Sequence, residues 1–140
     1  MPIIHQHTLK EHDVEYNSNV FYLFIENEKM KGGDYVSTML RDVPNGLPMT
    51  LKKSGGTGID SYYDDDEYIP IIYALNVDLD NINGLLLHRA IVVIPDITFH
   101  NDHLNMEFFN RKCPKFYKHF TTRYHHLIKQ FAPKKLPVWV

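Results

Sequence analysis

Acidic residues are missing from the last thirty positions of the sequence. From Arg111 to Val140 there are eight Lys and Arg but no Asp or Glu, whereas the first 110 residues hold all 17 acids and only seven bases. Such a separation of charge predicts a directional electric field, which attracts anions or an acidic partner surface. The sequence therefore indicates its carboxy-terminal part as the place where a ligand binds.

Cysteine and long apolar runs are also scarce. Cys113 is the only cysteine, so no internal disulfide can form, which is usual in a reducing compartment. The longest apolar runs, 84–87 and 90–95, are separated by His88 and Arg89 and are far too short to span a membrane. The first residues lack the pattern of a secretory signal. We expect a soluble, cytoplasmic protein with no membrane partner.

Signatures of enzyme families are missing as well. The sequence has no H-E-x-x-H, no paired C-x-x-C, no G-x-x-x-x-G-K-[ST] and no EF-hand loop. We therefore expect a binding protein that uses no cofactor rather than an enzyme. A composition rich in Asn, Asp, Ile, Tyr and Phe would suit a small phage or viral accessory protein.

What is present predicts a single domain over residues 1–140 with an α+β fold. We expect a mainly antiparallel sheet of four to six strands, packed by a carboxy-terminal amphipathic helix, with one short additional helix. The short helix should run from Tyr35 to about Asp42, capped by Asp34. Strands are expected at 2–9, 20–25, near 49–52, at 68–77 and 85–94 joined by a turn at 78–84, and in a hairpin of 97–99 with 104–109.

The final helix is the best defined element of the sequence. Pro114 is a favourable first helical residue, and Pro133 prevents continuation beyond about Phe131. At about 100° per residue, one side of this helix is apolar and suited to the core. The opposite side, which we call the cationic face, carries basic and histidine side chains: Lys115, Lys118, His119, Arg123, His125, His126 and Lys129.

The cationic face predicts binding of nucleic acid or of an acidic protein surface. Lys and Arg spaced along a rigid helix neutralise several phosphates and release their counterions. Two alternatives remain open. The lysines are either simply solvated, or they dock on the acidic loop of residues 64–67 in the same chain.

The carboxy-terminal tail offers a different function. Pro137 and Trp139 belong to an apolar end, which either tucks into its own domain or inserts into a neighbouring subunit. The second case would make the chain a structural or assembly component that forms homo-oligomers.

A group of His and Asp residues suggests a third function, a metal-dependent hydrolase or nuclease. Asp96, His100, Asp102 and His103 could hold a divalent metal that activates water. The alternative is that 101–102 is only a hairpin turn with polar flanks. We favour that alternative, and no metal site is expected.

Three other segments have simpler interpretations. The glycine-rich stretch 52–58 lacks a phosphate-loop pattern and is interpreted as a flexible loop. The acids at 64–67, 78 and 80 are interpreted as solvated rather than as a cation site. Cys113 precedes a helix start that would lower its pKa, but no partner histidine can be assigned to it.

Overall fold

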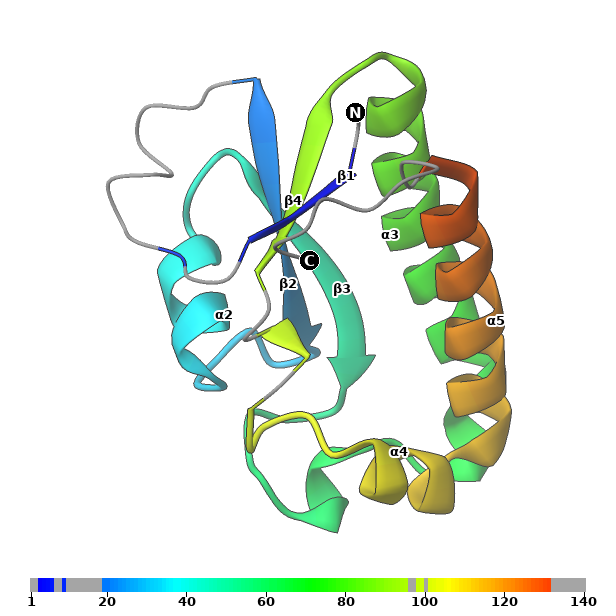
Figure 1. Ribbon diagram of the computed structural model, residues 1–140. Coiled ribbons are helices and arrows are strands. Elements are labelled where there is room, and N and C mark those ends of the chain that lie inside the picture. Colours follow the sequence, from blue (N-terminus) through cyan, green and yellow to red (C-terminus); the bar gives the residue numbers. More distant parts are fainter. Residues whose placement is uncertain (1–2, 7–8, 10–18, 96–97, 100, 132–140) are drawn as a thin grey trace.

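A parallel sheet forms the centre of the molecule (Figure 1). The computed structural model describes residues 3–6, 9, 19–95, 98–99 and 101–131. The strands of the sheet are β1 (Ile3–Gln6), β2 (Val20–Asn27), β3 (Gly46–Lys52) and β4 (Ile91–Pro95), in the order β1-β4-β2-β3. All three pairs are parallel. The expectation of a mainly antiparallel sheet is therefore wrong, although the α+β content is as expected.

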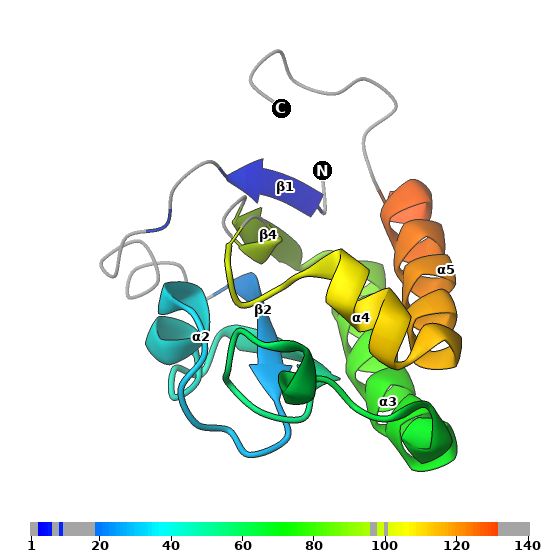
Figure 2. The ribbon, with the colours of Figure 1, turned by 90° about the horizontal axis from the view of Figure 1, so that it is seen from below.

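Helices lie on both sides of this sheet (Figures 1 and 2). Helix α2 (Tyr35–Leu40) covers one face, and α3 (Tyr68–Leu87) covers the other. Helix α5 (Pro114–Phe131) packs against α3 and against the short α4 (Met106–Lys112). Two short 3₁₀ turns, η1 (Ile59–Ser61) and η2 (Asp65–Glu67), lie between β3 and α3. On the face opposite α2, the helix that packs directly on the sheet is thus α3, and not the carboxy-terminal helix as expected.

Strand β2 is buried on both faces, as is typical of a parallel sheet. Leu23 and Ile25 belong to the large core under α3, whereas Tyr22 and Phe24 belong to a smaller core under α2. Parallel neighbours require crossover connections, and here α2 connects β2 to β3 while α3 connects β3 to β4. The two connections leave the sheet on opposite faces.

Helix α3 replaces the strand pair expected at 68–77 and 85–94, and only β4 remains of that pair. Its buried residues recur at helical spacing: Ile71, Leu75, Leu79, Ile82 and Leu86. The helical period is hard to see because the solvent side also carries large apolar residues, namely Ile69, Tyr73 and Val77. The Asp and Asn residues of 78–84, which suggested a turn, lie inside the helix.

Helix α4 replaces the second expected hairpin, of which residues 97 and 100 lie outside the described residues. The Asn105 side chain caps this helix by accepting a hydrogen bond of 3.0 Å from Phe108 N–H. Phe109 is fully buried and stacks on Tyr62 and Phe120, with ring centroids 5.5 and 5.9 Å apart. The apolar run at 104–109 therefore anchors a helix in the core.

The two remaining helix predictions are confirmed. Asp34 caps α2 by accepting a 2.7 Å hydrogen bond from Ser37 N–H. Helix α5 begins at Pro114 and ends at Phe131. No helix in the described part of the chain is both long and apolar enough to cross a membrane.

Candidate nucleic-acid interface

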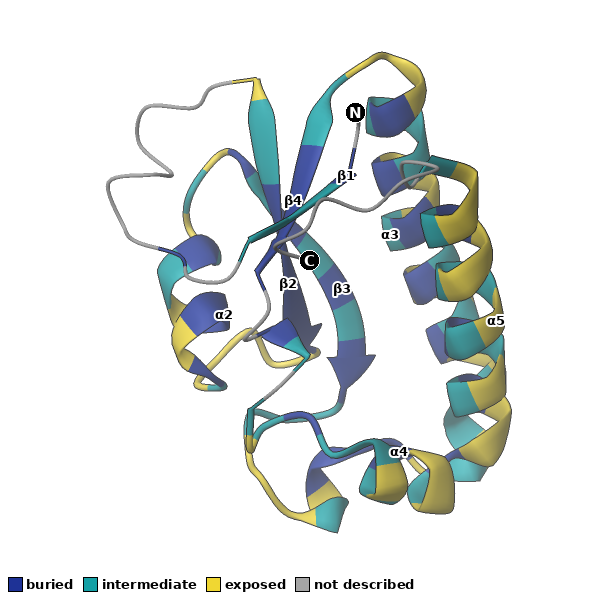
Figure 3. Cartoon of the chain, in the orientation of Figure 1, coloured by how far each residue is buried: buried dark blue, intermediate teal, exposed yellow. Residues whose placement is uncertain are grey.

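Aromatic packing fixes the rotation of α5 about its axis. Phe116, Phe120 and Leu127 are buried, and the ring of Phe120 stacks on Tyr124 at 5.4 Å. Most of the cationic face therefore points to solvent, and the outer side of α5 is exposed (Figure 3), whereas His119 and Arg123 are half-buried against α3. Its amphipathic pattern is realised as the sequence predicts.

Acids of the same chain neutralise part of the basic segment. Lys112 Nζ lies 2.9 Å from Asp64 Oδ1, and this pair raises the pKa of Lys112 and lowers the pKa of Asp64. Lys115 is held more loosely, with Nζ 3.9 Å from Asp65 Oδ2. Arg123 Nη2 lies 3.3 Å from Asp80 Oδ1 on α3. Docking on the acidic loop, which was one alternative for this helix, thus occurs at the amino-terminal end of α5.

A hollow of about 380 Å³ lies where α5 meets the start of α3. It is lined by Tyr68, Lys115, Lys118, His119, Thr122 and Arg123. Asn76 Oδ1 accepts from Arg123 Nη1 at 2.9 Å and lies 2.8 Å from His119 Nε2, so that it orients both side chains. Because the same oxygen can only accept, His119 carries its proton on Nε2. The hollow is therefore lined by groups that donate hydrogen bonds or carry positive charge.

Burial, and then the charge of Arg123, lowers the pKa of His119. The lowered pKa favours the neutral form of His119, which contributes a hydrogen bond rather than charge. Further along the cationic face, His125, His126 and Lys129 are exposed. Among the described residues, neither Lys118 nor Lys129 has an acidic partner. Lys118 and Lys129 are thus the cations most available to an external anion.

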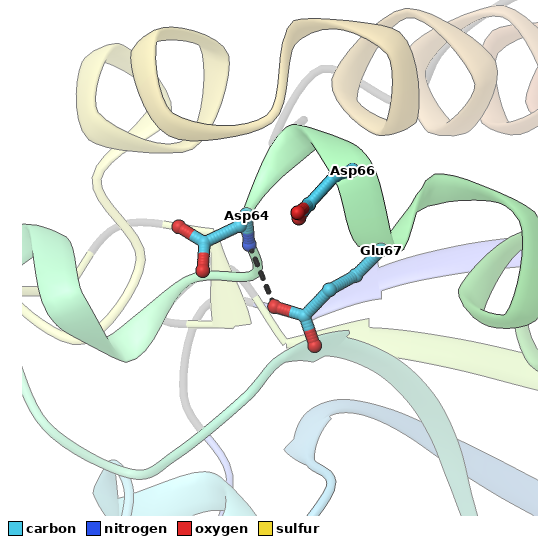
Figure 4. A group of neighbouring side chains, drawn as sticks. All are labelled: Asp64, Asp66 and Glu67. Carbon is cyan, nitrogen blue, oxygen red and sulfur yellow. Dashed lines mark hydrogen bonds between the residues drawn. The ribbon is translucent and has the colours of Figure 1, made fainter.

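The acidic cluster itself serves the fold (Figure 4). Ligand atoms of Asp64, Asp66 and Glu67 lie within 4.8 Å of one another. Glu67 Oε1 accepts from Asp64 N–H at 2.9 Å and from Lys53 Nζ at 3.2 Å, which caps η2. Because Asp64 is also bound to Lys112, two of these carboxylates already have protein partners.

Of the four His and Asp residues that were a candidate metal site, the structure describes only Asp102 and His103. Asp96 and His100 lie outside the described residues, as do Pro137 and Trp139 of the tail. Asp102 is exposed, and the backbone of His103 is bound to its neighbours: its N–H donates to Asn101 Oδ1 at 2.8 Å, and its carbonyl accepts from Lys52. Within the described part of the chain, no histidine belongs to a group of three metal-ligating side chains.

Cys113 is not an activated nucleophile. It is fully buried, and its thiol donates to the Phe109 carbonyl at 3.4 Å. Burial, aided by nearby carboxylates, raises the pKa of Cys113 to about 12. The expectation that the helix start would lower this pKa is wrong because desolvation of the thiolate dominates.

One group of polar residues was missed from the sequence. Lys52, interpreted as part of a flexible loop, is only 4% exposed, and Glu26, Asn27 and Asp34 are buried beside it. Glu26 and Asn27 end β2, Lys52 ends β3, and Asp34 follows the loop after β2. Each of the two strands is followed by a loop with two consecutive glycines, at 32–33 and at 55–56. This shared pattern of polar residues at a strand end before a glycine pair is visible in the sequence and was the signal that could have found the group.

The chain resembles one protein family over most of its length. Residues 4–123 match the model of a family described as a family of unknown function (DUF7831). No curated protein and no solved structure matches the chain.

Proposed function

The chain belongs to this family of unknown function, and we propose that it binds nucleic acid through the cationic face of α5. The observation that carries the proposal is the exposure of Lys118 and Lys129, which have no acidic partner among the described residues, beside a hollow lined by further cations. Such a surface contacts phosphates and not base edges, so binding should depend little on base sequence.

The spacing of the exposed lysines suits an extended polyanion. With a rise of about 1.5 Å per residue, Lys115, Lys118 and Lys129 span about 21 Å of one side of the helix. Three lysines that each neutralise one phosphate give a slope of log K against log salt of roughly −2 to −3. The partial pairing of Lys115 with Asp65 places the slope towards the weaker end of this range.

The test is binding of a labelled oligonucleotide, measured by fluorescence anisotropy over a series of salt concentrations. We expect Lys118→Glu to weaken binding and to reduce the salt slope by roughly one, because one phosphate contact is lost. Lys29→Glu is the matched control, since it makes the same change of charge at an exposed position in the loop after β2. Equal weakening by both variants, or no binding of the wild type at low salt, would reject the proposal.

An acidic protein surface is the other partner that this face fits. Carboxylates on a folded partner lack the even spacing of phosphates, so binding would depend on one geometry rather than on charge alone. Binding to an acidic protein at salt concentrations at which no nucleic acid is bound would favour this alternative.

A second candidate function is assembly of several copies. Exposed apolar side chains at Ile69, Tyr73 and Val77 recur every four residues along α3, and each is 59% exposed or more. Sedimentation equilibrium tests this candidate, because Tyr73→Lys should then shift the protein towards monomer. A wild type that is monomeric at all concentrations would exclude it.

A further inference from the structure

The carboxyl ends of β2 and β3 form a junction where the chain leaves the sheet in two directions. After β2 the chain passes to α2 on one face, and after β3 it passes to α3 on the other. In open parallel sheets, such a divergence opens a crevice beyond the strand ends, and ligands bind there. In this protein the crevice is lined from β2, β3, the start of α2 and the loop before α4.

Lys52 places a positive charge in this crevice. Its Nζ donates to the carbonyl of Gly56 at 2.6 Å and to the carbonyl of His103, and it lies 5.0 Å from the centre of the Tyr62 ring. An ammonium group has three N–H donors, so these carbonyls use two of them. Among the described residues, no carboxylate forms an ion pair with Lys52.

The nearest acids already have other partners. Glu26 is bound by Arg41 through two hydrogen bonds of 2.7 Å, and Asp34 accepts from Ser37 N–H. Asp34 acts on the Lys52 ammonium electrostatically, which opposes the lowering of its pKa by burial, but within the described residues it forms no ion pair with Lys52. The third N–H donor of Lys52 therefore has no protein acceptor in the described part of the chain, and an anion that enters the crevice would accept from it.

Two glycine loops close over the crevice. A side chain on Gly55 would lie 2.5 Å from the Lys31 carbonyl and 2.7 Å from Gly33 N, so the loops are in direct contact. Within the described chain, the N–H groups of Gly33 and Gly55 have no hydrogen-bond acceptor. The space left is about 10 Å³, roughly that of one water molecule. A hollow of about 270 Å³ adjoins it and shares Glu26 and Asn27.

We propose that this crevice is a second ligand site, which binds a small phosphate-bearing molecule. The phosphate contacts Lys52 Nζ and the N–H groups of the glycine loops, and the rest of the ligand occupies the adjoining hollow. Because the closed crevice holds only about one water, residues 53–58 must separate from residues 28–33 when the ligand enters. Backbone N–H groups of glycine loops beside a lysine are a common arrangement for phosphate binding.

Thermal unfolding with pyrophosphate, at constant ionic strength, tests the proposal. We expect the wild type to gain roughly 5–10 °C in Tm at a hundredfold excess over Kd. Lys53→Met is the matched control, because Lys53 is next in sequence but its side chain is 42% exposed and bound to Glu67. Lys118→Glu should also keep the gain, which separates this site from α5. Lys52→Met should lose it.

Two outcomes would overturn the proposal: equal protection of Lys52→Met, or no protection of the wild type even at millimolar pyrophosphate. If Lys52→Met does not fold, the pH dependence of pyrophosphate binding to the wild type decides. Burial lowers the pKa of Lys52 to about 8, so affinity should fall as pH rises through this value, although pyrophosphate only gains negative charge. Affinity that stays constant or rises over this interval contradicts the proposal. The other ionisable groups that line the crevice are Glu26, Asp34 and His103. Arg41 is hydrogen-bonded to Glu26, and the Tyr62 ring lies beside the Lys52 ammonium.

Discussion

The buried pair of Glu26 and Arg41 is predicted to be a strongly coupled interaction. Arg41 Nε and Nη2 each donate to one carboxylate oxygen of Glu26 at 2.7 Å, and the side chains of Arg41 and Glu26 are only 11% and 4% exposed. Arg41 Nη2 also donates to the Gly32 carbonyl at 2.8 Å, so that the pair holds the glycine loop against α2. The hydrogen bond to Glu26, which outweighs desolvation, raises the pKa of Arg41.

Removing either partner should cost much more than removing both. Arg41→Met leaves a buried carboxylate without its cation and should lower the free energy of unfolding by about 3–5 kcal/mol. Glu26→Met should cost a similar amount. The double variant leaves no uncompensated charge and should cost about 1–2 kcal/mol, so the coupling energy, which is the sum of the two single costs minus the double cost, should be at least about 4 kcal/mol.

Urea denaturation followed by circular dichroism measures these differences. The control cycle uses Arg111 and Glu107, whose Nη2 and Oε1 atoms are similarly close at 2.6 Å. Their side chains, however, are 59% and 74% exposed. That pair should couple by only about 0.3–0.5 kcal/mol, and its coupling should shrink with added salt. Coupling at Glu26 and Arg41 no larger than in the control would refute the reasoning that burial makes this pair important.

Three further predictions concern glycine, cysteine and lysine. Gly55→Ala forces a methyl group against the Lys31 carbonyl and should lower Tm clearly. Gly58→Ala has open space around the new methyl group and should leave Tm within about 2 °C of the wild type. Equal effects of the two variants would contradict the contact between the loops that hold Gly55 and Lys31. Cys113 should not react with a thiol reagent at pH 8 until the protein is unfolded in urea, and rapid reaction of the folded protein would contradict its burial. The pKa of Lys52 is lowered to about 8 in the folded state, so between pH 8 and 9.5 the unfolded chain binds more protons, and stability should rise with pH. This rise, measured as urea midpoints, should be absent in Lys52→Met.

The helices that the sequence predicted correctly are marked by local chemistry. Asp34 caps its helix through a hydrogen bond to a residue three positions away, and Pro114 sets the start of α5. Helix α3 lacks such signals, and the apolar residues on its outer side hide the helical period. Two adjacent strands at 68–77 and 85–94, joined by a short turn, would have to be antiparallel. The wrong assignment of 68–77 as a strand rather than as part of a helix therefore led to the wrong sheet topology.

The candidate site was predictable where it depends on α5 alone. The spacing of Lys118 and Lys129 on the outer side of the helix follows from the sequence. Their neighbour Arg123 is paired with Asp80, 43 positions away, and only the packing of α5 on α3 brings them together. Lys52 was missed for the same reason, because His103, which accepts its hydrogen bond, is 51 positions away.

The most direct test of the central proposal is a titration of the ¹⁵N-labelled protein with an oligonucleotide at low salt, followed by amide chemical shifts. Binding through the cationic face predicts that the largest shifts fall at Lys115, Lys118, Thr122 and Lys129 and disappear when salt is added. Shifts concentrated away from α5, or no shifts at all, would contradict the proposal that this helix binds nucleic acid.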